Sequence, residues 1–213
     1  MKRKLLTAVC VLLAAAAALS LLGCGRQLKI DTKSAAIYDT KSKIRYDYVS
    51  ANYLPKSVAE EKYATFVQNS VKVDYYEVEG LSPDEWLYSE LGELIRARGT
   101  ADLPDFSGFN PNSLLICYNS DLNFTFAEID DPAKVSEIAD RFNNGTASNP
   151  VYFDHETYKL LFSSPDYPEF YYRLLLIVTE EATYLFDRYT QRYVEAGDLF
   201  ADTIPAYSYE DHD

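Results

Sequence analysis

Short apolar runs joined by very short links constrain the fold of this chain more than any other feature of its sequence. The runs at 113–118, 171–179 and 183–188 are rich in aromatic and branched aliphatic residues, which favour β-strands. The links Asn119-Ser120-Asp121 and Glu180-Glu181 are too short to cross over between parallel strands. The sequence therefore predicts antiparallel hairpins in its second half.

Similar patterns, with period-two alternation or short apolar runs, recur elsewhere in the chain. The segment 55–69 is ambiguous, because it fits either a helical stripe or part of a long strand. We expect further strands at 43–49, 70–78, 122–129, 158–162 and 192–195.

A first helix is expected at 82–98. Ser82-Pro83-Asp84-Glu85 combines an N-capping serine, a proline at the first helical position and a glutamate three residues after the cap. Gly99 then supplies a stop signal. One face of this helix would be apolar and would carry Leu87, Leu91, Leu94 and Ile95.

A second helix is expected to begin at Asp131-Pro132 and to end at Asn143-Asn144-Gly145. Both helices would thus begin with a capping residue followed by proline, so an internal duplication of a strand-helix unit is conceivable. The apolar positions of the second helix have helical spacing and are Val135, Ile138, Ala139 and Phe142.

These elements predict an α+β fold, in which an antiparallel β-sheet of meanders and hairpins packs against two or three α-helices. The chain has 213 residues, 47% of them hydrophobic, which is enough for one well-packed core. We expect a single domain at 44–205, with one candidate seam at 100–112, and an acidic C-terminal tail at 206–213.

The N-terminus has the layout of an export signal. Lys2, Arg3 and Lys4 precede an uncharged run from residue 5 to residue 22. A plain secretory signal or an uncleaved membrane helix are the alternatives, since the run is just long enough to span a bilayer. The run ends in Leu21-Leu22-Gly23-Cys24, which resembles the lipobox of bacterial lipoproteins.

This resemblance implies a signal peptide at 1–23, a diacylglyceryl group on the sulfur of Cys24, and an anchor on the extracytoplasmic side of the cell membrane. Residues 24–43 would be the lipidated cysteine and a polar tether. The mature part is also similar in general texture to small lipoproteins of Gram-positive envelopes. Two acyl chains give stable anchoring, so the mature protein would stay on its membrane.

The charge of the chain limits its partners. Thirty-three acidic and 20 basic residues give a net charge of −13, and loss of the three N-terminal cations would lower it to −16. Such a chain would be repelled by nucleic acid. Because the tether holds no polybasic run, we expect the lipid alone to contact the membrane.

The sequence contains no catalytic or metal-binding template. Only His155 and His212 are histidines, and neither lies in a spacing that fixes an ion or a proton relay. Cys117 would be the one ordinary cysteine of the mature chain, so no intramolecular disulfide forms and a buried thiol is expected. We therefore expect no cofactor, no metal and no enzymatic activity.

Aromatic residues are unusually frequent, with 19 tyrosines and 11 phenylalanines. Tyr167, Phe170, Tyr171 and Tyr172 form the densest cluster and are a candidate binding face, because tyrosine offers a rigid ring with a polar tip. Tyrosines packed half-buried on a sheet are the structural alternative.

We therefore expect a non-enzymatic, lipid-anchored module that binds a protein, peptide or glycan. Two alternatives remain open at this point. One is a hydrolase of cell-wall or glycan material that uses two carboxylates. The other is an assembly factor of an envelope complex, which would expose a large apolar patch.

Overall fold

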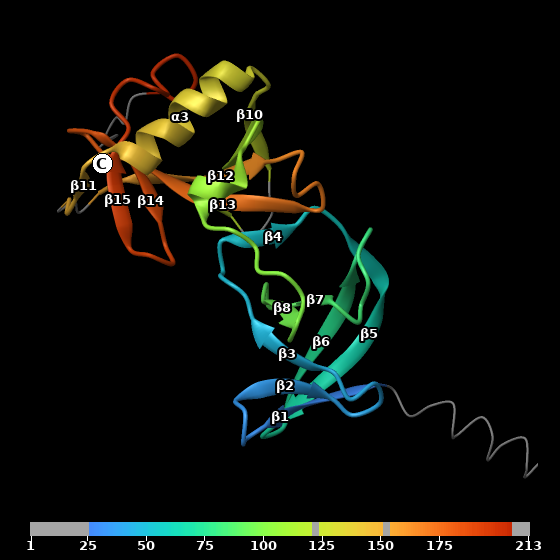
Figure 1. The fold of residues 1–213 in the computed structure, drawn as a ribbon. Helices are drawn as coiled ribbons and strands as arrows, with labels where there is room; N and C mark the ends of the chain where they lie inside the picture. The colour runs from blue at the N-terminus through green and yellow to red at the C-terminus, as the bar shows by residue number, and fades with distance from the viewer. Residues whose placement is uncertain (1–25, 121–123, 151–153, 206–213) are drawn as a thin grey trace, which may run out of the picture.

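The structure is a computed structural model, and it describes residues 26–120, 124–150 and 154–205. It consists of a small β-barrel followed by a second β-sheet, and Figure 1 shows the barrel and the sheet side by side. The signal peptide, the lipobox residues Leu21, Leu22 and Gly23, the lipidation site Cys24 and the acidic tail lie outside the described residues. Within the described part, no helix is long and apolar enough to cross a membrane.

Seven of the described strands close the barrel in the order β1-β2-β3-β8-β7-β6-β5. All neighbours are antiparallel except β1 and β5, whose parallel pairing closes the ring. In β1, a buried inner residue alternates with an outer one, as in Leu28 and Lys29. The barrel strands are β1 Gln27–Asp31, β2 Ala36–Asp39, β3 Arg45–Tyr48, β5 Val58–Gln68, β6 Val71–Val78, β7 Trp86–Ser89 and β8 Leu94–Ala97.

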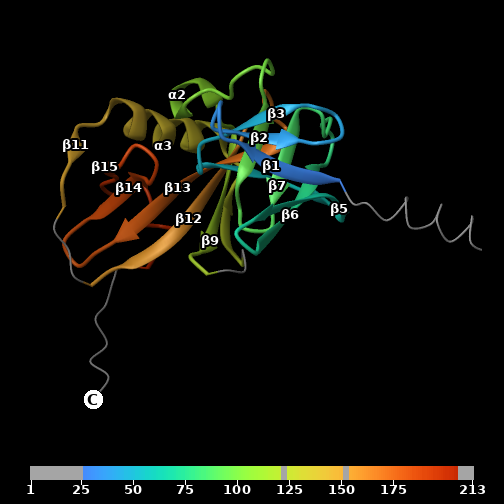
Figure 2. The same cartoon turned by 90° about the horizontal axis from the view of Figure 1, so that it is seen from below.

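The second sheet has the order β10-β9-β12-β13-β14-β15-β11, and all its pairs are antiparallel. Helix α3 (Pro132–Asn144) lies across one face of this sheet (Figure 2). Helix α2 (Phe106–Phe109) is a single turn. The strands are β9 Ser113–Tyr118, β10 Thr125–Ile129, β11 Ala147–Ser148, β12 Glu156–Ser163, β13 Phe170–Val178, β14 Thr183–Asp187 and β15 Arg192–Glu195.

The barrel and the sheet share one hydrophobic core. Strand β4 (Tyr53–Pro55) leaves the barrel and pairs with Phe170, Tyr171 and Tyr172 of β13. From the barrel wall, Val78, Trp86 and Leu94 join the core that α3 and the sheet enclose. A separate core fills the barrel and includes Leu28, Tyr46, Phe66, Tyr75, Leu87 and Ile95.

The expected α+β fold with two or three packed helices is wrong, since the protein is mostly β. The main reason is the segment 82–98, which forms β7 and β8 rather than a helix. Leu87 and Ile95 point into the barrel, whereas Trp86 and Leu94 point into the shared core. Strands buried on both faces lose period-two alternation, and their apolar residues here happened to match helical spacing.

The local helix signal of this segment is nevertheless visible in the structure. The backbone N–H of Trp86 donates to the carbonyl oxygen of Ser82 at 2.9 Å, and the N–H of Asp84 donates to Ser82 Oγ at 3.2 Å. One turn forms, and the strand then begins. Strand pairing in the barrel therefore overrides the helix propensity after that turn. The duplication of a strand-helix unit loses the first of its two helices.

Several other expectations are confirmed. All eight expected strands are present within a few residues of their predicted bounds. The strands on either side of the expected links 119–121 and 180–181 pair antiparallel, although Asp121 itself lies outside the described residues. Helix α3 begins after the cap Asp131, whose side chain accepts from the N–H of Ala133, and it buries the expected apolar face. The ambiguous segment 55–69 is largely the strand β5.

The segment expected to be a tether also differs from the prediction. Residues 26–43 hold β1 and β2, so the first barrel strand begins three residues after Cys24 in the sequence. These strands are short, and only Leu28, Ala36, Ile37 and Asp39 are buried in them. Because these strands contain so few apolar residues, the sequence shows no clear period-two alternation there.

Candidate functional site

A cleft of about 540 Å³ lies between the outer wall of the barrel and the sheet face opposite α3. Leu54, Val58 and Ala59 supply an apolar wall. Tyr76 and Tyr88 come from neighbouring barrel strands, where they form a cross-strand pair. Residues 89–92 of the β7–β8 turn, together with Lys159 and Arg173, complete the lining.

Arg173 is placed in this cleft by the alternation of β13. Tyr172 and Leu174 on either side of it are buried in the shared core. Since neighbouring residues of a strand point to opposite faces, Arg173 points away from α3. Its backbone N–H donates to the carbonyl oxygen of Asn52 at 2.7 Å, and its Nη2 donates to that of Ala51 at 2.6 Å.

Arg173 is half-buried and makes no ion pair with any described residue. Burial lowers the pKa of its guanidinium, and the nearby positive charge of Arg188 lowers that pKa further. A guanidinium has five N–H donors, and Ala51 takes only one of them. The remaining donors are available to a ligand in the cleft.

Two further groups in the cleft suit an anion. Lys159, on the neighbouring strand β12, donates from Nζ to the carbonyl oxygen of Ser120 at 2.5 Å. Burial raises the pKa of the Tyr88 hydroxyl, while the charge of Arg173 opposes this rise. Tyr88 therefore stays a neutral hydrogen-bond donor beside Arg173.

One acidic residue lines the same cleft. Glu90 Oε1 accepts a hydrogen bond from the backbone N–H of Asp74 at 3.0 Å. This bond ties the carboxylate to the barrel wall. The cleft thus contains two cations and one hydroxyl donor, Arg173, Lys159 and Tyr88, but only one carboxylate. Its polar part is therefore suited to a carboxylate or phosphate group of a ligand. Its apolar wall suits an adjoining hydrocarbon part.

The aromatic residues that the sequence suggested as a binding face do not form one surface. Phe170 and Tyr172 are 3% and 4% exposed and lie in the shared core. Tyr171 is half-buried on the opposite face, where the ammonium of Lys56 lies 5.1 Å from the centre of its ring. Tyr167 stacks on Phe109 at 5.6 Å. Most of this cluster is therefore structural.

Tyr172 also borders a second, smaller cavity of about 280 Å³. The exposed rings of Tyr48 and Tyr189 border it as well. Beside it, Asn52 Nδ2 donates to the buried carboxylate of Asp187 at 2.6 Å. Asp187 also accepts from the Tyr172 hydroxyl and from the backbone N–H of Tyr189. This network fixes the β14–β15 turn to the start of β4.

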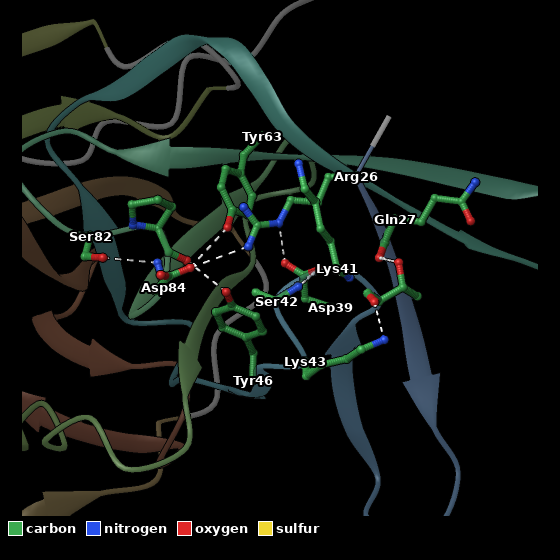
Figure 3. A network of polar contacts seen from close by, with 12 residues as sticks. Arg26, Gln27, Asp39, Lys41, Ser42, Lys43, Tyr46, Tyr63, Ser82 and Asp84 are labelled. Atoms are coloured by element: carbon green, nitrogen blue, oxygen red, sulfur yellow. Dashed lines mark hydrogen bonds and ion pairs between the residues drawn. The ribbon is translucent and has the colours of Figure 1, made fainter. Parts of the chain in front are cut away.

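A third polar network holds the beginning of the barrel (Figure 3). Arg26 forms an ion pair with Asp39, which is fully buried, and its guanidinium lies 4.0 Å from the ring centre of Tyr63. Burial tends to raise the pKa of Asp39, but the backbone N–H of Lys41 and the guanidinium of Arg26 outweigh it and lower that pKa. On the other side, Arg26 Nη2 lies 3.5 Å from Asp84.

The described residues contain no cluster of three or more histidine, cysteine, aspartate or glutamate side chains that would hold a metal ion. Cys117 is buried and is a free thiol, and burial raises its pKa. His155 lies beside β12 and contributes to no such cluster. His212 lies outside the described part of the chain.

No protein-family model, curated protein or solved structure matches this chain. The evidence for the candidate site therefore comes from its geometry alone. Arg173 was not among the site residues expected from the sequence, although the sequence contains one signal for it. It is the single charged residue of β13, an otherwise aromatic and aliphatic strand.

Proposed function

We propose that this protein is a lipid-anchored, non-enzymatic binding module on the extracytoplasmic side of a bacterial cell membrane. The lipobox-like sequence ending at Cys24 supports the anchor. In this proposal the ligand carries a carboxylate or phosphate group next to an apolar part, and it binds in the cleft around Arg173.

One observation carries the proposed ligand class. Arg173 is a half-buried cation without an ion pair in the described chain, and it lines a cleft of about 540 Å³. Arginines taken out of water usually pair with a carboxylate or phosphate, because desolvation of an unpaired charge is costly. A bound anion would supply that partner.

A titration with hexyl phosphate tests the ligand class, with inorganic phosphate and hexanol as the two partial ligands. We expect hexyl phosphate to bind most tightly in calorimetry, because only it fills both parts of the cleft. In ¹⁵N NMR spectra, the Nε–H signal of Arg173 should shift during the titration. Equal affinity for hexanol and hexyl phosphate would contradict an anion site.

The variant Arg173→Met keeps an extended side chain and removes the charge. We expect its affinity for hexyl phosphate to fall at least about tenfold, as for loss of a charged hydrogen bond. Lys134→Met, which removes a cation from α3, is the matched control and should bind like the wild type. Unchanged binding by Arg173→Met would show that the cleft is not the site.

The anchor has a separate test. Palmitate labelling of cells that express the full chain should mark the wild-type protein, and the Cys24→Ala variant should remain unlabelled. The wild type should fractionate with membranes after cleavage of the signal peptide. Equal labelling of both chains would exclude Cys24 as the lipidated residue.

A further inference from the structure

The basic residues of this acidic protein are unusually frequent from Arg26, just before β1, to the start of β3. Residues 26–46 contain six of them, Arg26, Lys29, Lys33, Lys41, Lys43 and Arg45, and only two acids, Asp31 and Asp39. The rest of the chain after Cys24 contains 11 cations and 31 acids. This asymmetry was not expected from the sequence, because the cations do not form a contiguous run and their segment was expected to be a tether.

The barrel places several of these cations on one outer surface. Tyr38 of β2 pairs with Lys29 of β1 on one side and with Arg45 of β3 on the other. The charged groups of Arg45 and Lys43 lie 5.3 and 5.8 Å from the centre of the Tyr38 ring. Since Ile37 and Asp39 beside Tyr38 are buried in the barrel, this row faces outward.

The same outward row continues across the parallel seam of the barrel. Leu28 pairs with Phe66, so the next residues, Lys29 and Val67, lie side by side. Val67 in turn pairs with Lys72 of β6. The row therefore contains three cations, one tyrosine and one valine, in the order Lys72, Val67, Lys29, Tyr38 and Arg45.

Exposed apolar residues adjoin this row. Val67 is 44% exposed, and Val71, just after the β5–β6 turn, is 58% exposed. Ile30 follows Lys29 on β1 and is 41% exposed. Ile30 and Val71 have the register parity of the inward-facing residues, so they lie exposed at the end of the barrel, next to the row and not in it. Cationic groups beside exposed valine and isoleucine side chains and a half-buried tyrosine ring are typical of surfaces that lie in a membrane interface.

The acidic neighbours of the row have their own partners. Asp31 pairs with Arg45 at 3.0 Å, and Asp74 pairs with Lys62 at 3.2 Å. Lys29, Lys33, Lys41, Lys43 and Lys72 form no ion pair within the described chain. These lysines are exposed, and their charge remains available to an anionic surface.

We propose that this outer surface of β1, β2, β3 and the β5–β6 turn docks on an anionic lipid bilayer. The place of the proposed anchor supports this orientation, because Cys24 lies only two residues before Arg26 and thus within about 7 Å of it. Figure 1 shows β1 and β2 on the side of the barrel away from the second sheet. The cleft around Arg173 then remains accessible.

This docking surface is separate from the ligand cleft, and it can be tested without the lipid anchor. The chain 24–213 with Cys24→Ala includes every described residue. It is sedimented with vesicles of 30% phosphatidylglycerol and 70% phosphatidylcholine, and with pure phosphatidylcholine. We expect binding to the anionic vesicles only, and release at 0.5 M salt. Equal binding to both vesicles, or to neither, would overturn the proposal.

Two charge-matched variants localise the surface. Each cation near an anionic membrane strengthens binding roughly fivefold, so Lys29→Gln with Lys43→Gln should weaken it about 25-fold. Lys134→Gln with Arg141→Gln removes two cations from α3 and should have little effect. If the first pair prevents folding, Lys33→Gln with Lys41→Gln, both in turns, replaces it. Equal losses in the barrel and helix variants would contradict a specific face.

A fluorescent label tests the depth of contact. In the Cys24→Ala and Cys117→Ser background, Val67→Cys carries an environment-sensitive dye, and Lys134→Cys is the control. We expect a blue shift of the Val67 label alone on anionic vesicles. No shift at that position would exclude insertion there. Soluble polyphosphate is then added as a competitor for binding to labelled anionic vesicles. If it displaces the protein as effectively, per phosphate group, as unlabelled anionic vesicles do, the surface is a general polyanion site and not a bilayer surface.

Discussion

The indole of Trp86 packs against the ring of Phe170, with 5.3 Å between the ring centres. Trp86 lies on barrel strand β7, and Phe170 begins strand β13 of the sheet. Both are almost fully buried in the core that the two parts share. This contact, together with the β4–β13 pairing, implies that the barrel and the sheet unfold as one unit.

Phe170→Ala tests this coupling. We expect the free energy of unfolding to fall by about 3 to 5 kcal/mol, because the substitution leaves a cavity in the core. Trp86 is the only tryptophan of the chain, so its fluorescence reports on this contact. In urea, the fluorescence and circular dichroism transitions should coincide in both proteins. Two separate transitions in the wild type would show independent domains.

A pair of aspartate substitutions tests the two helix predictions against the structure. Ile138→Asp places a charge in the buried face of α3, where Ile138 is fully buried, and should cost more than about 4 kcal/mol. Leu91→Asp should change stability by less than about 0.5 kcal/mol, because Leu91 is 66% exposed in the β7–β8 turn. Chemical denaturation measures both values. A large loss of stability with Leu91→Asp would contradict the exposed β7–β8 turn.

Asp39→Asn tests the buried ion pair with Arg26. We expect it to lower stability at pH 7 by on the order of 2 kcal/mol, through loss of a charged hydrogen bond. The folded-state pKa of Asp39 is lowered, so the carboxylate stabilises the fold above its unfolded pKa of about 3.9. As pH falls through the folded pKa, this contribution is lost.

The stability difference between wild type and Asp39→Asn should therefore narrow below about pH 4. Urea denaturation from pH 7 to pH 3 measures it. Asp84→Asn is the control, since the Asp84 side chain is 62% exposed and exposed ion pairs contribute little. A difference that is constant over the whole pH range would show that the charge of Asp39 is not involved.

The thiol of Cys117 should be unreactive in the folded protein. It is 1% exposed, and burial raises its pKa, so little thiolate is accessible to a disulfide reagent such as Ellman's. In the Cys24→Ala chain without its signal peptide, we expect one thiol to react in denaturant and almost none without it. Cys117→Ser should abolish the signal. Rapid reaction of the native protein would mean that β9 opens readily.

The sequence predicts most of the second sheet, because its strands and α3 obey simple periodic patterns. β12 and β13 are long, and their buried residues alternate with less buried ones over much of their length. The barrel is harder to predict. β7 and β8 are apolar on both faces, whereas β1 and β2 have few apolar residues at all. Barrel closure also depends on the parallel β1–β5 pair. These strands are distant in the sequence, and nothing in either segment predicts that it pairs with the other.

The candidate cleft was beyond sequence reasoning for a similar reason. Arg173 and Tyr88 are 85 positions apart, and they meet only because β7 faces the sheet across the β4 connection. The aromatic cluster at 167–172 attracted attention by its density, but rings that fill a core and rings that bind a ligand look alike in a sequence. Only the burial of each ring in the structure distinguishes the two cases.

The pairing of β4 with β13 also limits how the two parts of the molecule can move. The connection that contains β4 is hydrogen-bonded to the sheet from Asn52 onward, so this connection offers no free hinge at the base of the cleft. Opening and closing around a ligand would require these bonds to break. A ligand would therefore bind to a preformed cleft. Its binding should follow single-step kinetics, limited by diffusion and desolvation and not by a conformational change.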